Sequence, residues 1–152
     1  MYPPTDDPRD GFEVKARVSN RDIAYLLCTA FEGGVGYWCI IVDHVKPPTE
    51  VAWMDAGDKK PKVWKNYDWP VTPGGAVIVA ENEEWYEAEN EGDTSKVKTY
   101  RIDREAIQRG LARMQEKYAY HFANFMNDNA DAITGDVFLQ CCCDFEEGVR
   151  YG

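Results

Sequence analysis

The spacing of apolar residues along the chain changes several times between a period of two and a period of three to four. Alternating or short continuous apolar runs predict strands, and five segments show them: 12–18, 37–45, 50–56, 75–81 and 97–102. The last two enclose a glutamate-rich stretch, 82–97, so we expect a long antiparallel hairpin with that stretch as its turn. Residues 57–75 show neither period and predict an irregular segment.

Apolar residues at helical spacing predict three helices. The first covers residues 19–34, and the side chain of Ser19 or Asn20 can cap its start. Gly33 or Gly34 supplies the left-handed residue that ends it.

The second helix is long, because its apolar face extends over residues 107–126 behind the cap Asp103. The third helix starts at Asp131 or Thr134 and ends near Gly148. Four residues of the third helix are expected in the core: Val137, Phe138, Cys141 and Cys142.

The order of these elements is strand, helix, several strands and then two helices. This order predicts an α+β fold in which about three helices pack on one face of a largely antiparallel sheet. Residues 1–11 are rich in proline and aspartate and predict a flexible N-terminal arm. Residues 12–152 have the length of one globular domain.

The net charge of the chain restricts the kinds of molecule that it can bind. The chain has a formal net charge of −10, and residues 71–100 hold 7 acidic against 2 basic side chains. A phosphate backbone is repelled by such a field, so we expect no direct nucleic-acid binding and a partner with a basic surface. The sequence has no apolar window of about 18 residues and no secretory signal at its start, so we expect a cytoplasmic protein without membrane contact.

The stretch FEGGVGYW, residues 31–38, places three glycines beside two aromatic residues. Phosphate-binding loops precede helices, whereas these glycines follow one, at the end whose carbonyl groups repel anions. We therefore interpret the stretch as a helix stop. Gly36, Tyr37 and Trp38 could in addition form the wall of a pocket for a small ligand.

The five cysteines and two histidines do not form a recognisable metal or redox motif. Three adjacent cysteines on a helix point in directions about 100° apart, so Cys141, Cys142 and Cys143 cannot share one ion. We expect Cys141 and Cys142 in the core, Cys143 more exposed, and no disulfide framework. No constellation of catalytic side chains converges, so we expect neither an enzyme nor a cofactor or metal.

The segment 58–69 interleaves lysines with aromatic rings. Rings can stack on a base and lysines can bind phosphate, so the segment could hold a nucleotide. We favour a solvated loop with its rings turned inward, because a nucleotide site would have to overcome the net acidity locally. The residues of this alternative ligand site are Gly36, Tyr37, Trp38, Lys62, Trp64, Lys65, Tyr67 and Trp69.

The segment 81–93 holds seven acidic residues in thirteen. It could be a solvated hairpin tip, or its carboxylates could imitate the charge of a nucleic acid, with two aromatic residues as anchors in a basic groove. The partner-binding residues of this second interpretation are Glu83, Glu84, Trp85, Tyr86, Glu87, Glu89 and Glu91.

Four segments of the chain resemble a family of small acidic proteins of uncharacterised function encoded by bacteriophages and prophages. They are Asp22–Ile23, E-G-G-x-x-Y-W at residues 32–38, the helix at 109–122 and D-V-F-L-Q…Y-G at residues 136–152. The resemblance covers the first helix and the last fifty residues but not the middle of the chain. It brings no catalytic residues with it.

The resemblance implies a phage accessory protein, and such proteins often disable host immunity. We therefore expect an inhibitor in the cytoplasm of the infected bacterium that binds a host defence component, such as a CRISPR effector, by acidic mimicry. The alternative is a binder that sequesters a nucleotide immune signal. The sequence leaves the target open, and also whether the chain forms a homo-oligomer.

Overall fold

The computed structural model describes residues 11, 12, 14–54 and 56–152. An antiparallel sheet in the order β1-β2-β3 contains the strands β1 (Cys39–Val45), β2 (Ala76–Glu81) and β3 (Thr99–Ile102). The helices are α1 (Asn20–Gly33), α2 (Asp68–Val71), α3 (Asn82–Glu91), α4 (Arg104–Lys117), α5 (Ala119–Met126) and α6 (Ala132–Cys142), and the short 3-10 helix η1 (Val35–Tyr37) joins α1 to β1.

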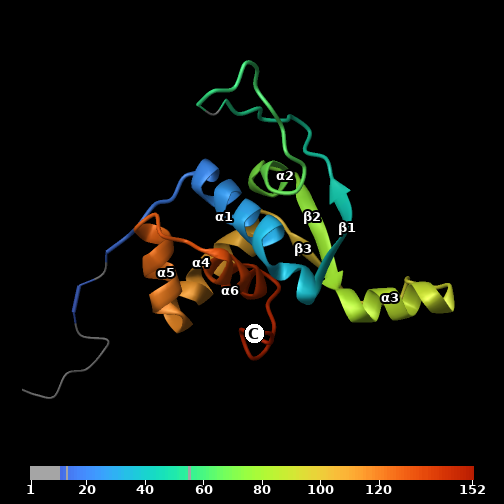
Figure 1. Cartoon of the computed structure of the whole chain (residues 1–152). Coiled ribbons are helices and arrows are strands. Elements are labelled where there is room, and N and C mark those ends of the chain that lie inside the picture. Colours follow the sequence, from blue (N-terminus) through green and yellow to red (C-terminus); the bar gives the residue numbers. More distant parts are fainter. Residues whose placement is uncertain (1–10, 13, 55) are drawn as a thin grey trace, which may run out of the picture.

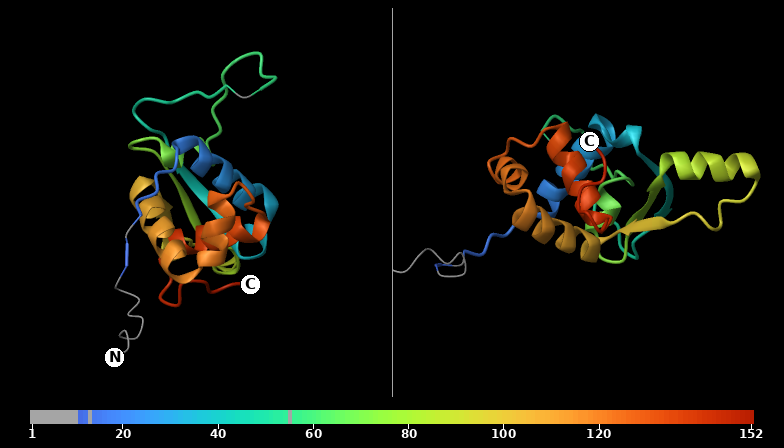
Figure 2. Two further views of the ribbon diagram at one scale, coloured as in Figure 1. Left: turned by 90° about the vertical axis from the view of Figure 1, so that its left-hand side faces the viewer. Right: turned by 90° about the horizontal axis from the view of Figure 1, so that it is seen from below.

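Helices α1, α4, α5 and α6 gather on one side of the sheet (Figures 1 and 2). The predicted α+β class is therefore confirmed. The described residues form six helices where three were expected. The extra ones are the four-residue α2, the acidic α3 and a second helix produced by a break in the long one.

β2 is the central strand and carries the middle of the core. Val77 pairs with Ile102 of β3, and Val79 pairs with Tyr100, and all four side chains are buried. A bulge shifts the register between β1 and β2 at residues 41–43. The predicted antiparallel pairing of 75–81 with 97–102 is thus correct, although their connection is not a turn.

The helix starts follow from local side-chain chemistry. Ser19, Asp103 and Asp131 each accept a hydrogen bond from the backbone N–H three residues later, at 3.0, 2.9 and 2.9 Å. Such caps satisfy donors that the first helical turn leaves without a partner. The predicted starts of α1, α4 and α6 are therefore confirmed.

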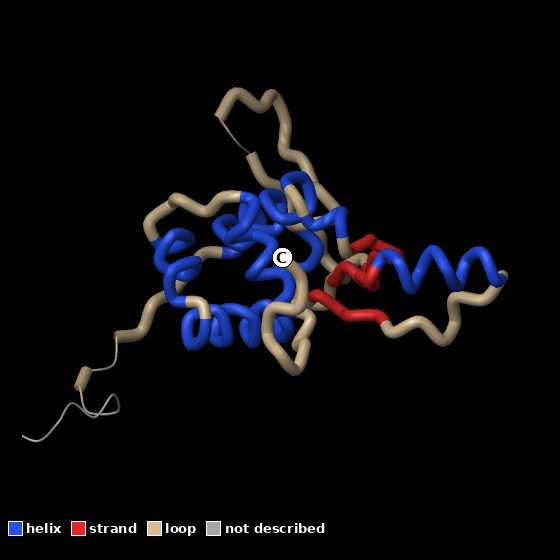
Figure 3. Tube along the Cα trace, turned by 60° about the horizontal axis from the view of Figure 1, so that its bottom comes forward, coloured by secondary structure: helices blue, strands red, loops and turns tan. Residues whose placement is uncertain are grey.

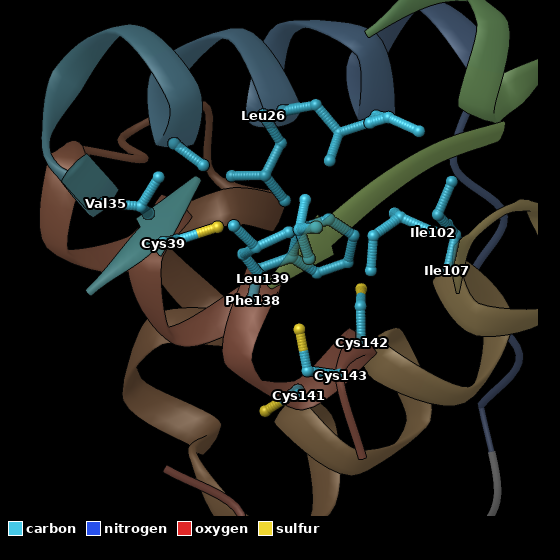
Figure 4. Close-up of a cluster of buried hydrophobic side chains, with 14 of the residues drawn as sticks. Leu26, Val35, Cys39, Ile102, Ile107, Phe138, Leu139, Cys141, Cys142 and Cys143 are labelled. Carbon is cyan, nitrogen blue, oxygen red and sulfur yellow. The ribbon is translucent and has the colours of Figure 1, made fainter. Parts of the chain in front are cut away.

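Two glycines let α6 approach its neighbours closely. A Cβ atom added to Gly110 of α4 would lie 2.4 Å from Sγ of Cys142, and one added to Gly135 of α6 would lie 2.8 Å from the backbone N of Ala30 in α1. The core between these helices and the sheet is shown in Figure 4, where the labelled residues include Leu26, Ile107, Phe138 and Leu139.

All three cysteines at the end of α6 are buried, as Figure 4 shows. This confirms the core positions of Cys141 and Cys142, but the expected exposure of Cys143 is wrong, because only 3% of its surface is exposed. Adjacent residues of a helix point in directions about 100° apart, so one of the three cysteines was expected to point outward. The chain instead folds back below α6, where Phe145 is also buried.

The strand expected at 12–18 is wrong. The described residues of this stretch belong to no strand, and Phe12 and Val14 are almost fully exposed. An alternating pattern of apolar and polar residues gives a segment one apolar face. A strand also needs a neighbouring strand for its backbone hydrogen bonds, and the alternation does not provide one. The expected arm at 1–11 lies outside the described residues except for Gly11.

Three smaller expectations also change. The stretch 50–56 contributes one isolated bridge, Trp53 to Lys62, instead of a strand. The irregular stretch 57–75 contains α2. Gly34 does cap α1, but its φ of 171° is extended, so the stop is not left-handed.

The long helix expected over 107–126 breaks at Tyr118. The Tyr118 hydroxyl accepts a hydrogen bond from the backbone N–H of Val149 at 2.8 Å, and Gly148 packs against the same ring. Gly148 therefore does not end α6, which stops at Cys142; it sits in a later turn with φ +85°. A contact between segments about thirty residues apart thus decides where the long helix divides.

Candidate functional site

The feature that stands apart from the rest of the fold is α3. It projects from the end of β2 away from the packed helices (Figures 2 and 3). None of its ten residues is buried. The expected hairpin turn is therefore wrong, because the acidic segment is a helix that ends at Gly92 in the left-handed conformation, whose N–H reaches the carbonyl of Ala88.

Four of the glutamates form one face of this helix. At 3.6 residues per turn they fall within an arc of about 100°, and we call them the glutamate stripe: Glu83, Glu84, Glu87 and Glu91. Tyr86, which is 52% exposed, flanks the stripe. Trp85 points about 160° away from Glu87 on the helical wheel and is half-buried, and Glu89 also lies off the stripe. The structure thus places five of the seven predicted partner-binding residues on or beside one surface.

The charges of α3 do not stabilise the helix itself. The stripe contains two like-charge pairs at i,i+4, Glu83 with Glu87 and Glu87 with Glu91, each unfavourable by about 0.2–0.5 kcal/mol. Glu89 and Glu91 also lie in the last turn, where the helix dipole disfavours an anion. Only the first-turn acids, Glu83 and Glu84, are favourably placed. The helix must therefore be held by contacts at its base.

Those contacts come from two residues at the junction of β2 and α3. The backbone N–H of Asn82 donates to the carbonyl of Trp38 at 2.8 Å, and the Asn82 side chain donates to the carbonyl of Gly36 at 2.8 Å. Glu81 is buried, and its Oε1 accepts from the Arg150 guanidinium at 2.9 Å and from the Tyr151 hydroxyl.

The aromatic pair of the glycine-rich stretch is tied to α6. The Tyr37 hydroxyl donates to Asp136 Oδ2 at 2.6 Å, and the indole N–H of Trp38 donates to Asp136 Oδ1 at 2.8 Å. Partial burial and the Asp136 carboxylate raise the pKa of Tyr37, so its hydroxyl stays a donor. Gln140, one turn further on, donates to the same Oδ1 at 2.9 Å.

The C-terminal residues complete this arrangement. Gln140 is fully buried, and its Oε1 accepts from the backbone N–H groups of Arg150 and Tyr151, each at 2.8 Å. The Tyr151 ring stacks on Trp38 with 5.2 Å between centroids and 9° between planes. Burial, followed by the Glu81 carboxylate, raises the pKa of Tyr151 to about 12. We call this set the tail clasp: Tyr37, Trp38, Glu81, Asp136, Gln140, Arg150 and Tyr151.

The tail clasp explains the tyrosine–tryptophan pair that follows the helix stop. Trp38 is 1% exposed and serves as a docking surface for the C-terminal residues. Sequence reasoning missed Asp136, Gln140 and Tyr151 as its partners. The available signal was that Asp136 and Gln140 are polar and one turn apart on a helix that is otherwise mostly apolar.

The residues predicted to bind a small ligand are not brought together. Gly36, Tyr37 and Trp38 lie before β1, whereas Trp69 contacts His44 near its other end, about 20 Å away for a strand of this length. The loop rings also contact one another, because Trp64 stacks on Tyr67 at 5.8 Å.

The polar groups of that loop are likewise engaged. The Trp69 indole donates to Glu50 at 2.9 Å, Lys65 lies over the Trp69 ring, and Lys62 pairs with Asp58 at 3.2 Å. Among the described residues, cavities of about 460, 830 and 90 Å³ are lined instead by the stretch 14–19, by residues of α1, α2, α4 and α5, and by Asp128 and Ala130. None of their lining residues belongs to the predicted ligand set, and nucleotide binding stays a prediction.

The cysteines are all free thiols. Burial raises the pKa of Cys39 to about 12 and that of Cys141 to about 11, so these thiols are protonated at neutral pH. Within the described ranges, no three His, Cys, Asp or Glu side chains are grouped as a metal ion would require. Nor does this part of the chain contain a helix with the length and apolar character needed to cross a bilayer.

Comparison of the chain with known protein families, with characterised proteins and with solved structures finds no significant match. The candidate site consequently rests on its geometry alone.

Proposed function

We propose that this protein is a phage-encoded accessory protein that binds a basic surface of a host defence component, such as the nucleic-acid groove of a CRISPR effector, and blocks it with α3. The observation that supports this proposal most directly is the glutamate stripe on a projecting helix with no buried residue. The face that carries the stripe is exposed along the helix and available for a partner, whereas the opposite face, with Asn82, Trp85 and Ala88, is half-buried.

The spacing of the carboxylates suits the imitation of a phosphate backbone. The four glutamates of the stripe lie between residues 83 and 91, a span of about 12 Å at 1.5 Å per residue. That is one negative charge per roughly 4 Å, comparable to the 3.4 Å per charge of one DNA strand. A groove that binds a nucleic-acid strand would meet a similar density of charge on α3.

The anchored base of α3 adds to the argument. A disordered acidic loop would lose conformational entropy when it bound, whereas a helix already held at its base loses little. Tyr86, exposed beside the stripe, provides an aromatic anchor of the kind that is enriched among the residues dominating binding energy.

The test compares two charge-matched triple variants. The first combines Glu84→Lys, Glu87→Lys and Glu91→Lys on the stripe, and the second combines Glu32→Lys, Glu116→Lys and Glu146→Lys at exposed positions elsewhere. Both change the net charge equally. A pull-down from host lysate identifies the target, and phage plating efficiency on a host with active defence measures inhibition.

The stripe variant should lose target capture and inhibition, while the control variant keeps both. Capture by the native protein should also weaken as salt rises, because the Debye length shrinks to about 3 Å at 1 M. Full inhibition by the stripe variant, or equal loss in both variants, would refute the proposal.

A further inference from the structure

The second projecting feature is the loop between β1 and α2, residues 46–67, which extends from the opposite end of the β1–β2 pair (Figure 1). Hydrogen bonds of 3.0 and 2.8 Å between the backbones of Trp53 and Lys62 close its base. It contains five lysines against three acids, so it is locally basic in a chain of net charge −10. We call it the lysine loop, and its basic side chains are Lys46, Lys59, Lys60, Lys62 and Lys65.

The lysine loop also exposes apolar surface. Val51, Met54 and Trp64 are 41%, 57% and 47% exposed, which places them among the most exposed large hydrophobic side chains of the described residues. Lys59 and Lys60 of the same loop are exposed as well. A loop that exposes both lysines and apolar side chains complements an acidic helix carrying an exposed tyrosine.

α3 is such a helix, but the lysine loop of the same copy cannot contact it. The lysine loop follows the end of β1 and returns toward the start of β2, whereas α3 follows the end of β2. β2 has six residues and therefore separates the two by roughly 20 Å, with α3 directed outward. One copy cannot bring its own α3 onto its own lysine loop, but a second copy can.

We propose that two copies of this chain form a reciprocal dimer in which α3 of each copy lies on the lysine loop of the other. The two surfaces sit at opposite ends of the same pair of strands, so a two-fold axis between the copies forms both contacts at once. In each contact the glutamate stripe faces Lys59 and Lys60, and Tyr86 meets the apolar residues of the loop. Each copy carries a net charge of −10, and the placement of an acidic helix on a basic loop reduces the repulsion between two such copies.

The dimer goes beyond the proposed function and modifies it, because it covers the glutamate stripe until a more basic target displaces the second copy.

Because each copy contributes both a helix and a loop to the dimer, charge reversals on the two surfaces can be tested separately and together. One variant combines Lys59→Glu and Lys60→Glu on the loop, and a second combines Glu87→Lys and Glu91→Lys on the stripe. A control combines Lys15→Glu and Arg17→Glu, which are exposed and lie elsewhere.

Sedimentation velocity and light scattering over a range of protein concentrations measure the dimer. The native protein should dimerise at low salt and dissociate at about 0.5 M salt. Each of the two test variants should dimerise at least about tenfold more weakly, and the control should match the native protein. A mixture of the two test variants should restore a dimer with one copy of each, because in that pair every lysine again faces a glutamate.

A native protein that stays monomeric at every concentration would refute the dimer. So would a dimer that the loop and stripe reversals leave unchanged, or a mixture that does not re-form it. The loop variant keeps α3 intact and should still inhibit the host target. A failed dimer with inhibition retained therefore counts against the dimer alone, and a stripe variant that inhibits fully counts against the proposed function alone.

Discussion

Replacing Gln140 by leucine tests the tail clasp directly. Leucine has a similar volume and keeps the apolar contacts of a fully buried position, but it removes the amide. Four hydrogen bonds disappear: two that the amide donates, to Asp136 at 2.9 Å and to the Tyr151 carbonyl at 3.1 Å, and two that it accepts from the backbone of Arg150 and Tyr151.

The expected loss follows from those bonds. Each contributes about 0.5–1.5 kcal/mol net, so four contribute about 2–6 kcal/mol if nothing rearranges. The C-terminal residues can instead detach and regain water, which limits the loss but gives up the stacking of Tyr151 on Trp38, about 0.5–1.5 kcal/mol. We therefore expect the free energy of unfolding to fall by about 2–4 kcal/mol.

Urea unfolding followed by tryptophan fluorescence measures this change, with Gln115→Leu on the exposed face of α4 as the matched control. Hydrogen exchange supplies a second readout, because a detached C-terminus releases Glu81 from its bonds to Arg150 and Tyr151. The backbone amides of α3 should then exchange faster in the Gln140 variant, and their exchange rates should stay the same in the control. A loss below about 1 kcal/mol, or no change at α3, would show that the clasp does not hold the helix.

Four further outcomes are expected. Gly135→Ala should cost about 1–3 kcal/mol in urea unfolding, because the new Cβ meets the backbone of α1, whereas Gly36→Ala, with no atom within 4 Å of its Cβ, should cost far less. Burial holds the pKa of Cys141 at about 11 and that of Cys39 at about 12, so the folded protein keeps protons that the unfolded chain releases from about pH 8.5 upward. The free energy of unfolding should accordingly fall as pH rises from there toward 12, and a Cys141→Ala variant should show a shallower fall. Glu87→Gln should raise the stability of the fold by about 0.5 kcal/mol, because it removes two repulsions along α3, while weakening capture of the host target. Native mass spectrometry of protein isolated from infected cells should show the mass of the polypeptide without a nucleotide; a retained nucleotide would favour the sequestration alternative.

Structural features that depend only on residues close together in the sequence could be predicted. The caps at Ser19, Asp103 and Asp131 depend on a side chain and an amide three residues apart, and all three are correct. α3 was missed although its sequence carries helix signals, with two glutamates in the first turn and Gly92 after the last. A clear apolar stripe at helical spacing is missing, because no residue of the helix is fully buried and only Asn82, Trp85 and Ala88 are half-buried.

The tail clasp could not be predicted in the same way. Tyr37 and Trp38 meet Asp136 across 99 and 98 residues of sequence, and a single sequence gives no register between segments so far apart. The break at Tyr118 has the same origin, because its hydroxyl bonds to Val149. Each of these contacts depends on how the helices pack against one another. The local pattern of apolar and polar residues does not specify that packing.

The stability of α3 links the contacts at its base to the role that we propose for its charges. Its like-charge pairs and last-turn glutamates oppose helix formation by about 1–3 kcal/mol, of which the first-turn Glu83 and Glu84 offset about 0.3–1 kcal/mol each. The four hydrogen bonds that Glu81 and Asn82 make at its base contribute a comparable amount, at about 1 kcal/mol each. The contacts at its base therefore supply stability that the charge pattern of the helix does not, and under the proposed function that charge pattern serves the partner. Residues that break a local rule of folding while a distant network compensates are the expected sign of a functional surface.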